Sequence, residues 1–144
     1  MSDFILVDGD KALFMSFFED AMVWGPTGKI KGSGPALLNG KKICIVGDEA
    51  SVKVDGCQYL TPTYSIPGQG TLTISKLADD QKAQKTTTGS TAVILKGSMF
   101  EAEFKVDSPA QQPPPGPGGP TPDSKKKYAG QGMFITTNRK FTGV

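Results

Sequence analysis

The chain has 144 residues, 16 of them basic and 14 acidic, which leaves a formal charge of +2. This balance argues against nucleic acid or an anionic membrane as an electrostatic partner. Histidine is absent, which excludes Ser-His-Asp and Cys-His nucleophiles and every imidazole metal site. The length predicts one domain, or one domain with a tail.

The N-terminus and the absence of long apolar runs set the expected compartment. No run approaches the roughly 20 apolar residues of a membrane span. The first residues lack a positive segment, and Asp8 and Asp10 follow the first apolar run closely. We therefore expect synthesis in the cytoplasm without a secretory signal peptide.

The first apolar run covers residues 4–7 and reads as a short strand closed by the turn pair Asp8-Gly9. Residues 11–24 are ambiguous. Their apolar positions recur at helical spacing and Asp10 is a suitable helix cap, whereas their aromatic content and the preceding turn favour strands. Helix and strand both remain open for this segment.

Asn39-Gly40 is the strongest hairpin signal, because a type I′ turn needs positive φ at both central residues. It joins residues 36–38 to residues 43–46, and Gly47-Asp48 ends the second strand. Related patterns occur at residues 68–84 and 88–106, with turns expected at Ser75-Lys76 and Lys96-Gly97. Three such hairpins in one chain predict pseudo-threefold symmetry, which suits the end of a true trimer.

Composition changes near residue 107. Residues 108–123 hold seven of the eleven prolines and three glycines, so we expect a linker there, partly in the polyproline II conformation. Residues 124–144 are then a C-terminal tail with one short strand near residues 133–137, which either docks back on the main body or waits for a partner. The run Lys125, Lys126 and Lys127 is either solvated or contacts an acidic surface.

The first hairpin resembles the repeat of PAAR proteins. Ser33, Leu37, Asn39-Gly40 and Gly47-Asp48 match the frame of that repeat, and residues 7–10 resemble its N-terminal Gly-Asp element. The Pro-Ala-Ala-Arg tetrad itself is missing, because residues 41–44 read Lys-Lys-Ile-Cys. The resemblance covers roughly residues 3–106.

The resemblance implies a small, mainly β cone of short strands and β-hairpins with pseudo-threefold repeats over residues 1–107. Such a cone caps a trimeric β-helical spike, one copy per trimer, at the tip of a type VI secretion system, contractile phage tail or extracellular contractile particle. Sheath contraction drives it through a target envelope, so the protein leaves the cell and contacts the target membrane transiently. Extensions beyond the cone in such proteins carry effectors or dock cargo, which is the role implied for the tail.

Family members commonly hold a metal with three histidines and a cysteine. This chain has no histidine, and two thiolates cannot complete a four-coordinate shell, so we expect no metal and no cofactor. Cys44 and Cys57 are the one weak candidate pair, and free thiols, a disulfide or a metal all stay open for them. The sequence shows no nucleotide-binding loop, no metal-protease motif and no argument for a cleft between paired carboxylates, so we expect no enzyme.

Two sets of residues are predicted to matter. Apolar strand residues are expected to pair with the trimeric partner: Leu37, Leu38, Ile43, Ile45, Leu72, Ile74, Val93, Ile94 and Leu95. Turn residues are expected to shape the hairpins: Asn39, Gly40, Gly47, Asp48 and Gly97. Two alternatives remain: a small β-barrel module that binds nucleic acid or peptide, and another baseplate or tail component.

Overall fold

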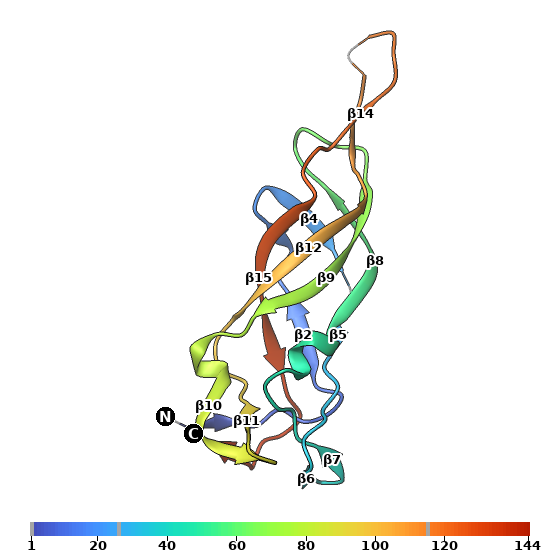
Figure 1. The fold of residues 1–144 in the computed structure, drawn as a ribbon. Helices are drawn as coiled ribbons and strands as arrows, with labels where there is room; N and C mark the ends of the chain where they lie inside the picture. The colour runs from blue at the N-terminus through green and yellow to red at the C-terminus, as the bar shows by residue number, and fades with distance from the viewer. Residues whose placement is uncertain (1, 26, 115) are drawn as a thin grey trace.

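The computed structural model describes residues 2–25, 27–114 and 116–144 of the chain, and it is an elongated, mainly β molecule (Figure 1). Both termini lie at its lower end, and the loop between β13 and β14 forms its upper end. The mainly β fold predicted from the sequence is confirmed. The elements are β1 Asp3–Phe4, β2 Lys11–Phe14, β3 Phe17–Phe18, β4 Ala21–Trp24, β5 Gly28–Lys29, β6 Leu37–Leu38, β7 Lys41–Lys42, η1 Asp48–Ser51, β8 Lys53–Leu60, β9 Gly68–Lys76, η2 Asp79–Gln81, β10 Lys82–Thr88, β11 Thr91–Ile94, β12 Phe100–Ser108, β13 Gln111–Gln112, β14 Thr121–Pro122, β15 Lys127–Ile135 and β16 Thr142–Gly143.

Eight strands form one antiparallel sheet in the order β3-β4-β8-β9-β12-β15-β2-β5, which curls into a half-barrel. Side chains alternate between the two faces of the sheet: on β12, Phe100, Ala102 and Phe104 are buried, whereas the residues between them face outward. The concave side encloses the core.

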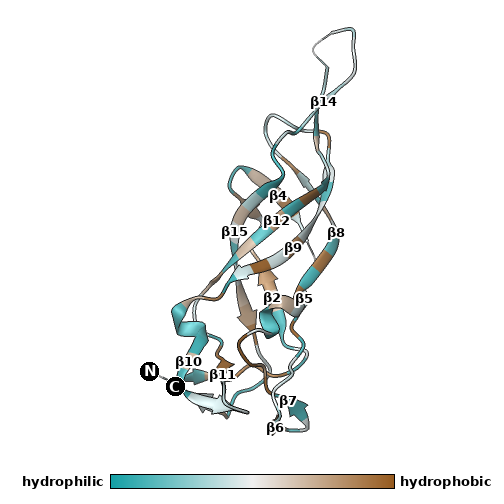
Figure 2. Cartoon of the chain, in the orientation of Figure 1, coloured by the Kyte–Doolittle hydropathy of each residue, from teal (hydrophilic) through white to brown (hydrophobic). Residues whose placement is uncertain are grey.

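Aromatic rings fill that core. The Tyr59 and Phe104 ring centroids lie 5.0 Å apart, and those of Phe100 and Phe134 lie 4.9 Å apart. Gly132 permits one of these contacts, because a Cβ atom there would lie 2.5 Å from Cζ of Phe100. Figure 2 shows hydrophobic residues along the sheet and around β11, and none among the described residues of the upper loop.

Residues 11–24 form β2, β3 and β4, so the strand reading of this segment is right and the helix reading is wrong. Ala12, Phe18, Ala21 and Val23 are buried, and β4 alternates between buried and outward positions. The helical spacing of the aromatic residues in this segment comes instead from the tight β3–β4 hairpin, whose turn has positive φ at Glu19.

The C-terminal third is more ordered than its composition indicates. Gln111 and Gln112 pair with Pro122 and Thr121, so a short two-stranded element stands where we expected a linker alone. The strand in the expected tail, β15, is nine residues long and lies between β12 and β2. It is part of the main sheet, because Tyr128 and Phe134 supply core side chains that a linker-bound tail would leave exposed.

The three expected hairpins have different outcomes. The first is confirmed as β6–β7, with φ of 50° at Asn39 and 80° at Gly40. The second is wrong: β9 pairs with β8 and β12 and not with residues 77–84. The third is also wrong: β11 pairs with β10 across the turn Gly89-Ser90, and β12 pairs with β9 and β15, so residues 91–95 and 99–106 do not pair across Lys96-Gly97. Among the described residues, no helix is long and apolar enough to cross a membrane.

Gly40→Val tests the first hairpin. A Cβ atom at Gly40 meets no heavy atom within 4 Å, so the cost comes from forcing a β-branched residue to positive φ. We expect the free energy of unfolding to fall by about 1–3 kcal/mol, measured by chemical denaturation. Gly119→Val is the control, because Gly119 has equally open space without positive φ and should leave stability unchanged. Equal stability of the two variants would contradict the turn assignment.

Candidate functional site

Three short segments close a ring at the end of the molecule that holds both termini: residues 4–8, 42–46 and 92–96. The amide of Leu6 donates to the carbonyl of Ile94 at 3.0 Å, the amide of Ile94 to Cys44 at 2.9 Å, and the amide of Cys44 to Leu6 at 3.0 Å. Each central residue therefore donates to one neighbour and accepts from the other. This cyclic order is that of a threefold axis.

A second set of hydrogen bonds repeats the cycle further out. The amides of Asp8, Val46 and Lys96 donate to the carbonyls of Lys42, Ala92 and Phe4, at 2.8, 2.9 and 2.8 Å respectively. The residues that flank the central ones also pair in cyclic order: Ile5 with Leu95, Val7 with Ile43, and Ile45 with Val93. The ring thus has pseudo-threefold symmetry within one polypeptide.

The same turn follows each ring segment. Gly9, Gly47 and Gly97 occupy equivalent positions and have positive φ values of 87°, 112° and 55°. In the first two copies an aspartate closes the turn: Oδ2 of Asp10 accepts from the amide of Val7, and Oδ2 of Asp48 from that of Ile45, both at 2.8 Å.

The third copy has Ser98 at this position and uses a different acceptor. The carbonyl of Gln81 accepts from the amide of Leu95 at 2.9 Å. Gln81 is fully buried and its side chain is held by the amide of Ala78 and the carbonyl of Lys96. The third copy therefore departs from the Gly-Asp motif and keeps the hydrogen bond through the backbone.

A pair of two-residue strand stretches precedes each ring segment. These are β6–β7, the Thr87–Thr88 and Thr91–Ala92 end of β10–β11, and the terminal pair β16–β1. Their registers correspond: Leu37 pairs with Lys42, Thr87 with Ala92, and Thr142 with Phe4. Two of the pairs are joined by two-residue turns, and the third is assembled from the two ends of the chain.

The ring separates two apolar clusters. The central residues Leu6, Cys44 and Ile94 are buried in the main core. Their neighbours Ile5, Ile43, Val93 and Leu95 form a second cluster with Ala83. Strand alternation places these two sets on opposite sides of the ring.

The structure disperses the residues predicted to bind a partner. Ile43, Val93 and Leu95 are covered in the second cluster, and Ile94 in the main core. Leu72 and Ile74 are buried on β9 in the main core, away from the ring. Leu37 is 58% exposed, and Leu38 and Ile45 are half-buried, so these three offer accessible surface at the ring end.

Sequence reasoning missed the register of the repeat and two exposed residues that flank β16, Phe141 and Val144. A signal for the register existed. Residues 5–10, 43–48 and 93–98 read ILVDGD, ICIVGD and VILKGS, which are three apolar residues, a variable position, Gly, and Asp or Ser. The predicted turn residues Gly47, Asp48 and Gly97 belong to this six-residue repeat, whereas Asn39 and Gly40 belong to the hairpin before it.

Both cysteines are free and buried. Burial raises the pKa of the Cys44 thiol, and nearby carboxylates raise it further. Burial also raises the pKa of Cys57, whose Sγ lies 3.5 Å from the carbonyl of Val54. Within the described part of the chain, no group of three or more His, Cys, Asp or Glu residues is placed to hold a metal ion.

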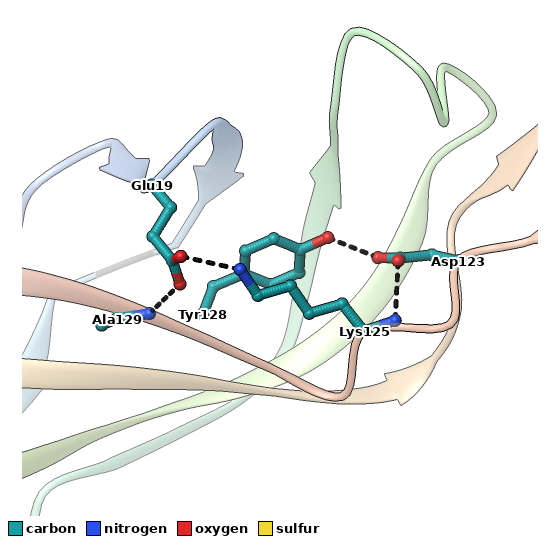
Figure 3. A network of polar contacts seen from close by, with 5 residues as sticks. All are labelled: Glu19, Asp123, Lys125, Tyr128 and Ala129. Carbon is teal, nitrogen blue, oxygen red and sulfur yellow. Dashed lines mark hydrogen bonds and ion pairs between the residues drawn. The ribbon is translucent and has the colours of Figure 1, made fainter.

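Hydrogen bonds to Asp123 hold a second segment against the main sheet (Figure 3). This segment, here called the upper arm, begins at residue 110, ends at residue 123 and includes the upper loop. Oδ2 of the buried Asp123 accepts from the hydroxyl of Tyr128 at 2.5 Å and from that of Tyr59 at 2.9 Å. The Tyr59 hydroxyl in turn accepts from the amide of Ala110 at 2.9 Å. The two ends of the arm, residues 110 and 123, are thus tied to strands β8 and β15.

An ion pair flanks this network. Nζ of Lys125 donates to Oε1 of Glu19 at 2.7 Å, and the amide of Ala129 donates to Oε2 at 2.9 Å, which connects the β3–β4 hairpin to β15 (Figure 3). The hydrogen bond from Lys125, followed by that from Ala129, lowers the pKa of Glu19. Lys125 of the basic run therefore has a defined internal partner, and Lys127 forms a longer ion pair with Glu103 at 3.6 Å.

Tyr128→Phe removes one of the two phenol donors of Asp123. We expect the free energy of unfolding to fall by about 1–3 kcal/mol, because a buried carboxylate loses a hydrogen bond. Tyr64→Phe is the control: within the described chain the Tyr64 hydroxyl makes no hydrogen bond, so its loss should change stability little. Chemical denaturation of both variants at neutral pH measures the difference, and equal effects would contradict the assigned role of Tyr128.

The pH dependence of stability, compared between wild type and Tyr128→Phe, gives a further test. Burial, and then the hydrogen bond to Asp123, raises the pKa of Tyr128; burial raises that of Tyr59 to about 12. A raised pKa in the folded state stabilises the protein below the unfolded value near 10 and loses this effect as pH rises toward the folded value. The stability gap between wild type and Tyr128→Phe should therefore shrink by about 1 kcal/mol between about pH 8 and about pH 11. A gap that is constant over this range would contradict the shift.

Comparison with known proteins agrees with the ring geometry. A search of curated proteins finds no match. The family model described as "Contractile injection system spike tip protein" matches residues 1–144, which confirms the resemblance drawn from the sequence. With a pseudo-threefold ring in its fold and a family match over its whole length, the chain belongs to the spike tip family of contractile injection systems.

Proposed function

We propose that the protein is a non-enzymatic structural tip that caps a trimeric spike through its ring end. The observation that carries this proposal is the pair of cyclic hydrogen-bond sets that join residues 4–8, 42–46 and 92–96. A single chain with a threefold ring presents three similar surfaces around one axis. A trimer presents three identical surfaces around its own axis, so the two match when the axes coincide.

The ring end also offers the chemistry for such a contact. Leu37 on β6 is 58% exposed, Phe141 beside β16 is 44% exposed, and Val144 is 42% exposed. Among the described strands, β6 pairs with β7 alone, so its other edge can pair with a strand of a partner. Apolar side chains together with a free strand edge favour a protein partner at this end.

The opposite end has a different character. Residues 113, 114 and 116–120 of the upper loop are exposed prolines and glycines, which lack large apolar side chains and offer few donors. Family membership implies assembly into a contractile particle that acts outside the cell. We propose that the upper loop points away from the spike and meets the target envelope first during contraction.

The threefold ring also sets the expected stoichiometry. One ring covers the end of one trimer, so we propose a single copy of this chain per three spike chains. Another tail or baseplate component would occur in multiples set by the particle's symmetry, so its copy number distinguishes it from a tip.

Leu37→Asp tests docking through the ring end. The exposed site tolerates the charge in the free protein, whereas the charge is costly when buried against a partner. Mixed with the trimeric spike protein of its own particle and analysed by native mass spectrometry, wild type should give one chain per trimer. We expect Leu37→Asp to weaken that complex by about tenfold or more.

Ile66→Asp is the control, because Ile66 is a 37% exposed apolar residue that pairs with Gln111 in the upper arm. It should bind the spike as wild type does. A ratio other than one to three, or a loss of binding in Ile66→Asp alone, would contradict the proposed function.

A further inference from the structure

The three strand pairs around the ring are closed by different means. Asn39-Gly40 and Gly89-Ser90 close two of them as two-residue turns. The third pairs Asp3 with Gly143 and Phe4 with Thr142, so strands from opposite ends of the chain meet without a turn. A short covalent turn keeps its strands together at high effective concentration, whereas the terminal pair depends on what holds residues 136–144, the closing segment.

Asn138 organises the closing segment. Its Nδ2 donates to the carbonyl of Ile5 at 2.9 Å and to that of Phe141 at 2.7 Å. Its Oδ1 accepts from the amides of Lys140 and Phe141 at 3.1 and 3.0 Å. In the first hairpin, the carbonyl equivalent to Ile5 belongs to Ile43 and accepts from the backbone amide of Gly34. The Asn138 side chain thus supplies the hydrogen bond that the backbone supplies in the first hairpin.

Asp10 anchors the start of the same segment. Its Oδ2 accepts from the hydroxyl of Thr136 at 2.5 Å and from the amide of Val7 at 2.8 Å. Asp10 and Thr136 are both buried. One carboxylate therefore shapes a ring turn and holds the closing segment against it.

The end of the closing segment reaches the neighbouring strand pair. The carbonyl of Val144 accepts from the amides of Lys85 and Thr86 at 2.6 and 2.9 Å, and its amide donates to Oγ1 of Thr86 at 2.8 Å. Gly143 lies so close to β10 that a Cβ atom would be 3.1 Å from the Thr86 hydroxyl and 3.2 Å from Leu95. Release of this segment would free the amides of Ile5, Lys85 and Thr86 and uncover Leu95.

We propose that the closing segment is a latch: its docking completes the third side of the spike-binding face, and only the closed form binds the spike trimer. This inference rests on the proposed function and names what that face requires. Because the terminal pair lacks a turn, it is the side of the ring that opens first. Asn138 is a positioning residue in this scheme, since it acts through the closing segment and need not touch the partner.

Asn138→Asp tests the latch. It keeps the size and the acceptor of the side chain, and it places an anionic oxygen against the carbonyls of Ile5 and Phe141. In hydrogen exchange we expect the amides of Ile5, Lys85 and Thr86 to exchange about tenfold faster or more, whereas the amide of Ile43, bonded to Ala36, keeps its rate. Binding to the spike trimer should weaken by a similar factor.

The matched control is Gln112→Glu, the same amide-to-acid change on β13 of the upper arm, away from the ring end, at an exposed residue that makes no side-chain hydrogen bond within the described residues. It should alter neither the three amides nor binding by more than about twofold. A second variant carries Asn138→Asp in a backbone cyclised from residue 144 to residue 1 through a short glycine linker. If the latch acts through closure, cyclisation should restore both protection and binding.

The outcomes separate the two proposals. Fast exchange with unchanged spike binding in Asn138→Asp overturns the latch and leaves the proposed function intact. Unchanged exchange, or no rescue by cyclisation, also overturns it. Failure of the wild-type chain to bind the spike trimer overturns the proposed function itself.

Discussion

The cyclic hydrogen bonds among Leu6, Cys44 and Ile94 are the constraint on which the rest of the structure depends. They bring together three segments that are about 40 to 90 residues apart in the sequence, and each segment then sends a strand, β2, β8 or β12, into the main sheet. The returning strands β4, β9 and β15 pair with β8, β12 and β2, so the threefold order of the ring continues into the half-barrel. The hydrogen bonds that build the ring end therefore also set the order in which strands pair in the main sheet.

Backbone hydrogen bonds around the axis, together with aspartates that cap two of the ring turns, hold the three segments together. Asp10 and Asp48 each receive a ring amide, and Asp123 receives two phenol hydroxyls at the other end. These carboxylates are paired with donors, which offsets the cost of their partial or full burial.

The β class, the Asn39-Gly40 hairpin and the Gly-Asp turns were predictable, because each depends on local backbone preferences that a few residues encode. The ring register was harder, since the six-residue repeat is weak in its third copy, where Ser98 and the carbonyl of Gln81 replace the aspartate. The place of β15 was not predictable from its neighbourhood, because it depends on pairing with β12 and β2 across a proline-rich arm. Burial of Leu72 and Ile74 likewise follows from the curl of the sheet, which alternation alone does not give.

The most direct measurement is electron cryomicroscopy of the tip bound to its spike, reconstructed without imposed symmetry. The account predicts one chain per trimer, with residues 4–8, 42–46 and 92–96 centred on the spike axis and the upper loop pointing away. A ring displaced from that axis, or an upper loop buried in the spike, would contradict it.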